Sequence, residues 1–192
     1  NVFIQDANSL AMNPEVLTEG LLYLKNTFPT IERVTSYARS RTIARRLTVE
    51  QLKTLKEAGL TRLHIGLETG YDFLLDYMKK GVTKEEHIMA GTKVKASGIE
   101  LSEYVVLGLG GQTWWQEHAR ETADALNKIN PDYIRFRTLK VLKGMPLYDR
   151  LEKGEFLLPR EEQILREEKL LIERLEGITS VIKSDHILNL LE

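Results

Sequence analysis

The sequence predicts an α/β fold in which parallel strands form part of a TIM-like (β/α) barrel, followed by a C-terminal helical extension. Apolar runs rich in β-branched residues recur about every 30 residues, which is the length of a strand–helix–strand unit. Helical patterns fill the intervals, and such alternation produces a parallel sheet with right-handed crossovers. We place the partial barrel in residues 1–158 and the extension in residues 159–192.

The third strand shows the expected pattern most clearly. Leu63, Ile65 and Leu67 alternate with His64 and Glu68. Because successive side chains point to opposite faces of a strand, the three apolar residues suit the helix-covered face, and the two polar residues would face the barrel interior. The five expected strands are residues 2–6, 33–38, 62–68, 101–108 and 133–139.

Capping residues mark the expected helices. Asn13 precedes a helical proline, and Thr83 begins a capping box with Glu86. The basic run at residues 38–46 is expected to be a solvated loop. The expected helices are residues 13–28, 48–59, 83–98, 114–129 and 160–176.

Composition restricts the class of protein. The 192 residues carry a formal net charge of −1, which gives no support for binding nucleic acid or anionic membranes. No apolar run is long enough to span a bilayer, and we expect a cytoplasmic protein. There is no cysteine, so these residues can form neither a disulfide nor a thiolate-bound cluster, and we expect no metal site in them.

Polar residues gather where the predicted strands end. Ligand sites in parallel α/β folds lie at the carboxyl ends of the strands, so we expect these side chains to converge on a ligand site. The alternative is a structural ion pair between Glu68 and either Arg135 or Arg137. The converging residues would be Asp6, Asn8, Arg39, Glu68, Arg135 and Arg137.

Three glycines follow the fourth strand, in the stretch VVLGLGGQT at residues 105–113. The spacing matches neither a dinucleotide fingerprint nor a Walker loop, so a strand-to-helix turn and a ligand-binding loop are about equally supported. His87 and His118 lie in helical patterns beside charged residues and are expected to be solvated.

Four blocks together resemble the radical S-adenosylmethionine superfamily, in the style of its coproporphyrinogen-oxidase-like members. They resemble the second, fourth, fifth and sixth strands of that family's barrel, and their order and spacing cover nearly all of residues 1–158. The resemblance implies S-adenosylmethionine and a 4Fe–4S cluster as cofactors of the full-length protein. The blocks read VFIQDANSL, EAGLTRLHIGLETGYDFLLDYMKKG, GIELSEYVVLGLGGQT and NPDYIRFRTLKVLKGMPLYD.

The resemblance also implies roles for single residues. Glu68 would lie near the ribose or the methionine, and Lys80 would hold the methionine carboxylate. A zwitterion needs opposite charges at fixed positions, which such a pair provides. The remaining expected contacts are Asp6, Ala7 and Asn8 at the methionine amino group, Val106, Gly108 and Leu139 at adenine, and Tyr37, Arg39 and Arg137 elsewhere on the cofactor.

The sequence departs from the family pattern in several places. The CxxxCxxC motif, whose thiolates hold the cluster, is missing. Tyr37 and Tyr104 stand where members often carry a carboxylate, and residues 6–9 read DANS, not Gly-Gly-Glu. We therefore expect a fragment of a radical enzyme that lacks its first βα unit. Alone it would be inactive and would bind no cofactor.

The resemblance leaves the substrate open, as a small molecule or a peptide. In such enzymes, reductive cleavage of S-adenosylmethionine starts hydrogen abstraction. Two other functions stay possible: a metal-dependent barrel hydrolase that uses Asp6, His64 and Glu68, or a non-catalytic interaction domain with residues 160–176 as the partner helix. The uncovered strand at residues 2–6 is also expected to favour self-association.

Overall fold

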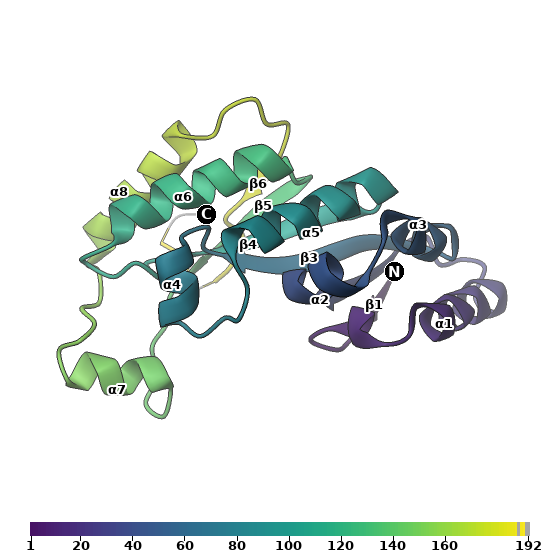
Figure 1. Ribbon diagram of the computed structural model, residues 1–192, viewed down its shortest axis with the longest axis horizontal. Coiled ribbons are helices and arrows are strands. Elements are labelled where there is room, and N and C mark those ends of the chain that lie inside the picture. The colour runs from purple at the N-terminus through teal and green to yellow at the C-terminus, as the bar shows by residue number, and fades with distance from the viewer. Residues whose placement is uncertain (188, 191–192) are drawn as a thin grey trace.

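The computed structural model describes residues 1–187 and 189–190, and these contain one sheet of six parallel strands in chain order (Figure 1). Each strand pairs in parallel with the next, so the predicted partial barrel of parallel strands is confirmed. The strands are β1 (Val2–Ile4), β2 (Val34–Ala38), β3 (Leu60–Glu68), β4 (Glu100–Leu107), β5 (Tyr133–Thr138) and β6 (Val181–Lys183).

Helices occupy the crossovers between the strands. All five expected helices are present, with ends shifted by a few residues at most, and no helix of the described residues is both long and apolar enough to cross a membrane. The helices are η1 (Ser9–Ala11), α1 (Pro14–Thr27), α2 (Ser40–Arg46), α3 (Val49–Glu57), α4 (Asp72–Tyr77), α5 (Lys84–Ser97), α6 (Trp115–Ile129), α7 (Pro146–Glu152) and α8 (Glu161–Glu173).

The main helices lie side by side over one face of the sheet. Helices α1, α3, α5, α6 and α8 each contact the next in the row, and Figure 1 shows α5, α6 and α8 running next to one another. Leu63, Ile65 and Leu67 of β3, together with Ile134 and Phe136 of β5, are fully buried in this core. Burial of each such side chain stabilises the fold by about 1.5–3 kcal/mol.

Two local predictions are corrected by the structure. The basic run at residues 38–46 contains helix α2 and not only a loop, because Ile43 and Ala44 bury one side of it against the core. The extension at residues 159–192 is not purely helical: after α8 the chain returns to the sheet, and Val181 of β6 pairs with Tyr133 of β5.

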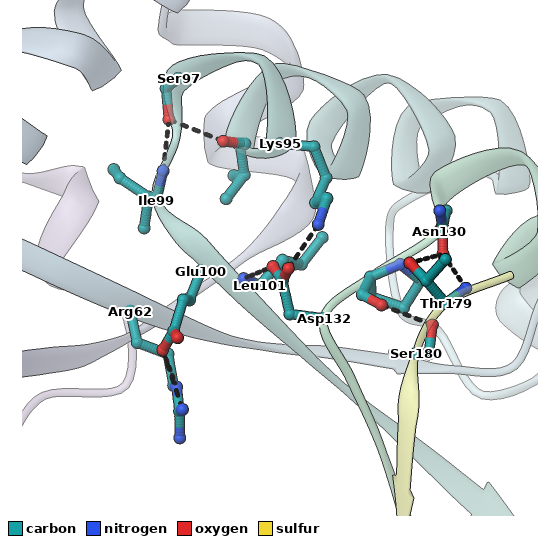
Figure 2. Close-up of polar contacts among 12 residues, drawn as sticks. Arg62, Lys95, Ser97, Ile99, Glu100, Leu101, Asn130, Asp132, Thr179 and Ser180 are labelled. Atoms are coloured by element: carbon teal, nitrogen blue, oxygen red, sulfur yellow. Dashed lines mark hydrogen bonds and ion pairs between the residues drawn. The ribbon is translucent and has the colours of Figure 1, made fainter.

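The amino-terminal ends of β3 to β6 are joined by polar contacts (Figure 2). The carboxylate of Asp132, just before β5, accepts two hydrogen bonds. One comes from the Lys95 ammonium at 2.6 Å and the other from the backbone N–H of Leu101 at 2.8 Å. Arg62 Nε of β3 donates to Glu100 of β4 at 2.8 Å. These contacts fix where each strand begins, and thereby where each strand ends at the opposite side of the sheet.

Candidate functional site

A cavity of about 780 Å³ lies at the carboxyl ends of the strands. Its walls come from β2 to β5, from the loops that follow β1, β2 and α4, and from the starts of α2 and α5. Seven of the eleven residues expected to bind the cofactor line it: Ala7, Tyr37, Arg39, Glu68, Lys80, Val106 and Arg137. The expectation that a polar site forms at this edge thus agrees with the geometry, while the ligand stays a prediction.

Glu68 occupies a sharp turn at the end of β3. Its φ is 60°, and Thr69 N–H donates to Leu67 O at 2.7 Å, which closes a γ-turn around it. Gly66 makes room for the side chain, since a Cβ at that position would lie 3.0 Å from Glu68 Oε1. A buried strand ends in a glycine and a glutamate here because the glycine lets the carboxylate lie over the strand.

Lys80 forms an ion pair with Glu68. The loop that carries it is tightly wound: Lys79 has φ 54°, Gly81 has φ 67°, and Lys80 N–H donates to Leu75 O at 2.9 Å. The two side chains expected to bind a zwitterionic ligand, one acidic and one basic, therefore pair with each other at the cavity wall.

The alternative ion pairs between Glu68 and an arginine are wrong. Arg135 Nη1 contacts Asp185 at 2.8 Å, and Arg137 lies 3.9 Å from the same carboxylate. Arg137 also sits 4.6 Å above the ring of Tyr104 and lines the cavity. Arg135 instead lines a neighbouring hollow of about 430 Å³.

Four of the expected cofactor residues lie outside the cavity wall: Asp6, Asn8, Gly108 and Leu139. Asn8 supports the wall indirectly, because its side-chain oxygen accepts the backbone N–H of Arg39 at 3.0 Å and its amide donates to Thr42 at 2.9 Å. Asp6 Oδ1 accepts the N–H of Ala7 at 2.8 Å. These contacts position Ala7 and Arg39, which do line the cavity.

The glycine stretch after β4 packs against its own chain. A Cβ at Gly110 would lie 2.7 Å from the carbonyl of Trp114, and one at Gly111 would lie 2.8 Å from the carbonyl of Leu157. The backbone N–H of Gly108 donates to Glu167 of α8. Of the two readings, the strand-to-helix turn is the one that this packing supports.

His64 stands among aromatic rings on the inner face of the sheet. Its ring centroid lies 5.8 Å from that of Tyr37, 5.9 Å from that of Tyr104 and 6.0 Å from that of Phe3. Burial, followed by the nearby charge of Arg62, lowers the pKa of His64 to about 4. The imidazole is therefore neutral at physiological pH and forms part of an apolar, aromatic wall.

The prediction that His87 and His118 are solvated is wrong. His87 is 2% exposed, and His118 is fully buried. Ser40 Oγ lies 2.7 Å from His87 Nδ1, and both residues line the cavity. Burial lowers the pKa of His87 to about 4, with a smaller contribution from Lys80, so this ring is neutral too.

Several residues of the cavity wall were not expected from the sequence. The basic run supplies Arg41 beside the expected Arg39, and the loop after α4 supplies Lys79 beside Lys80. With Arg137, five basic side chains and one carboxylate, Glu68, line a cavity in a chain of net charge −1. The other missed wall residues are Ala38, Ser40, Met78, Val82 and His87.

Comparison with known proteins relates this architecture to a family. The sequence pattern of the radical SAM superfamily matches residues 12–126. The tRNA uridine(34) acetyltransferase of Methanocaldococcus jannaschii is 26% identical over 117 residues, which cover 60% of this chain and 22% of that protein.

Solved structures that share the fold include two whose chains are longer than this one. The archaeal Methanocaldococcus infernus Elp3 with an N-terminal deletion matches with a TM-score of 0.70 at 18% identity, over 95% of this chain and 46% of its own. Coproporphyrinogen III oxidase (HemN) of Escherichia coli matches with a TM-score of 0.68 at 18% identity, over 88% of this chain and 38% of its own. The chain therefore spans less than half the length of these three proteins. Since the family pattern covers more than half of its residues, the chain belongs to the radical SAM superfamily.

Proposed function

We propose that the cavity at the strand ends binds S-adenosylmethionine and that the protein is a radical SAM enzyme acting on a substrate still to be found. The observation that carries the proposal is the Glu68–Lys80 pair, held by two backbone turns of positive φ in the wall of the cavity. Strained backbone of this kind clusters at ligand sites. Membership of the superfamily, whose members are enzymes that use this cofactor with a 4Fe–4S cluster, supports the assignment.

The wall offers a partner for each part of the cofactor. Lys80 would hold the methionine carboxylate, and Glu68 would accept hydrogen bonds from the amino group or the ribose. Val106, Met78 and Val82 provide the apolar surface that an adenine ring needs. On binding, the ligand's carboxylate would replace Glu68 as the partner of Lys80, and its amino group would replace Lys80 as the partner of Glu68. Neither side chain would then be left without an opposite charge.

The residues present do not fit an iron–sulfur cluster. The 192 residues contain no cysteine, and the part of the chain that the structure describes has no group of three His, Cys, Asp or Glu side chains able to hold a metal ion. The thiolates would have to come from outside these residues. We therefore propose that the 192 residues alone carry out no radical chemistry.

When held by Glu68 and Lys80, S-adenosylmethionine would supply the chemistry of the family, the removal of a hydrogen atom from a substrate. The residues described here would bind and orient the cofactor. The aromatic wall of Tyr37, His64 and Tyr104 would keep water away from it.

The hydrolase alternative has less support. Asp6 does not line the cavity that His64 and Glu68 share, and no described group of side chains around them could hold a metal ion. The non-catalytic interaction domain remains the competing proposal, and cofactor binding separates the two.

The experiment is calorimetric titration of the complete protein with S-adenosylmethionine, after anaerobic reconstitution with iron and sulfide and without reductant. Glu68→Ala and Lys80→Ala should each weaken binding about ten- to hundredfold, the value of one charge-assisted hydrogen bond. Iron content should stay unchanged, because neither residue is a cluster ligand.

Glu162→Ala, in an exposed ion pair on α8, is the matched control and should bind normally. Unchanged affinity in both site variants would remove Glu68 and Lys80 from the site. A complete protein that takes up no iron would end the radical assignment and favour the interaction domain.

A further inference from the structure

A buried polar network joins helix α8 to the turn that carries Glu68. The side chains of His118 on α6 and Glu167 on α8 are both 0% exposed. Glu167 Oε1 lies 2.8 Å from His118 Nδ1 and accepts the backbone N–H of Gly108 at 2.9 Å. On the other edge of the ring, His118 Nε2 lies 3.3 Å from the backbone oxygen of Glu68. The network thus reaches the ends of β3 and β4 without lining the cavity.

The partners of His118 fix where its protons lie. The carbonyl of Glu68 has no proton to give, so Nε2 must carry one and donate it. On the Nδ1 side, a single proton lies between the ring and Glu167 Oε1. Removing any one of these groups would leave another buried donor or acceptor without a hydrogen bond, which destabilises the fold.

The restraint acts on a backbone that would not keep its shape alone. Glu68 has φ 60°, in a region that side-chain-bearing residues rarely adopt, and its carbonyl belongs to the same peptide group as the Thr69 N–H that closes the γ-turn. Such conformations persist where surrounding contacts over-determine them. The hydrogen bond from His118 is a contact of this kind, applied to the residue whose carboxylate enters the cavity wall.

We propose that His118 and Glu167 are positioning residues for cofactor binding. Through the carbonyl of Glu68 they hold the γ-turn so that the carboxylate faces the cavity, and helix α8 thereby takes part in a site that it does not touch. This inference rests on the proposed function, because the ligand whose binding reports it is S-adenosylmethionine. It also joins the extension at residues 159–192 to the barrel site.

The test is a thermodynamic cycle in the complete, reconstituted protein, with S-adenosylmethionine binding measured by calorimetry without reductant. The four proteins are the wild type, Glu68→Ala, His118→Phe and the double variant. If His118 acts through Glu68, His118→Phe should lower affinity about tenfold in the wild type and less than about twofold in the Glu68→Ala background. Equal losses in both backgrounds, or no loss in the wild type, would overturn the proposal.

A second set of variants separates positioning from folding. Glu167→Gln keeps an oxygen that can accept the N–H of Gly108 and adds an amide N–H that can donate to Nδ1 of His118, so affinity should stay within about threefold of wild type, whereas Glu167→Leu should lose as much as His118→Phe. Leu171→Ala removes a fully buried side chain from the same helix and is the control for lost stability alone.

Melting temperature should fall in Leu171→Ala while cofactor affinity of the folded protein stays normal. The same affinity loss in Leu171→Ala as in Glu167→Leu would show a general packing effect and refute positioning. A wild type that binds no S-adenosylmethionine refutes the proposed function itself. If the wild type binds normally and the affinity losses of Glu68→Ala and His118→Phe simply add in the double variant, only the positioning role is refuted.

Discussion

The two ends of the sheet are built differently. At the amino-terminal end, the charges of Arg62 and Glu100 neutralise each other, and Asp132 joins Lys95 to the backbone of β4 (Figure 2). At the carboxyl end, five basic side chains line a cavity with Glu68 as the single acidic one, and the backbone adopts positive φ at several positions. One end holds the strands together, whereas the other keeps charge and backbone strain available for a ligand.

The difference has a physical consequence. Paired charges at strand starts have their partners whether or not a ligand is present, so they contribute to the fold alone. Basic side chains that line one cavity repel one another, and a carboxylate group of a ligand bound among them would relieve this repulsion. Substitutions at the two ends should therefore separate stability from binding.

The largest expected effect lies between the two ends, at Glu103 in the middle of β4. Its side chain is fully buried on the helix-covered face, and burial raises its pKa to about 8. Above the ordinary carboxyl pKa of 4.5, the unfolded chain releases this proton and the folded chain keeps it. The contribution of Glu103 to stability should thus fall by about 1.4 kcal/mol per pH unit between pH 4.5 and 8, while the neutral rings of His64 and His87 contribute in the opposite direction below pH 6.5.

Glu103→Gln should remove this contribution, since the amide does not titrate, so the stability of the variant relative to the wild type should rise with pH. Urea unfolding at pH 5, 6, 7 and 8, for the wild type and the variant, measures it. Glu162→Gln on the exposed face of α8 is the control and should keep the wild-type slope. Parallel curves for wild type and Glu103→Gln would mean that Glu103 is ionised in the folded protein and would refute this prediction.

Asp132→Ala should have the next largest effect and should act on stability alone. It removes the partner of Lys95 and leaves the N–H of Leu101 without its acceptor. Because Asp132 is about one-third exposed, we expect a loss near the lower limit for charged hydrogen bonds, about 1.5 kcal/mol in urea unfolding. Affinity for S-adenosylmethionine should not change. A variant of normal stability and weakened binding would reverse the roles assigned to the two ends.

The sequence predicted well wherever a long periodic pattern decides the structure. Alternation along residues 62–68 placed Glu68 on the inner face, and the caps at Asn13 and Thr83 placed the starts of α1 and α5. Such elements bury one face against a single core, so the spacing of their apolar residues directly indicates the element and its buried face.

The parts that were missed depend on few residues or on distant partners. Helix α2 has two buried apolar residues within a basic run, and β6 has only three residues, too few for a periodic pattern. The burial of His87 and His118 follows from Ser40 and Glu167, which lie 47 and 49 positions away in the chain. No local pattern around a histidine reveals such a partner.

The smallest expected effect concerns the free edge of the sheet at β1. Val2 N–H donates to Arg33 O at 2.8 Å, so the N–H of the next residue, Phe3, points to the unpaired side. Sedimentation of the 192-residue chain should show weak self-association, about millimolar, because a three-residue edge offers only a few hydrogen bonds. Phe3→Pro removes the free donor and should weaken association, whereas Phe3→Leu loses the ring but keeps the donor and should associate as the wild type does. A clean monomer at high concentration, or equal behaviour of the two variants, would count against pairing through this edge and would leave the aromatic contact of Phe3 with Tyr37 as its role.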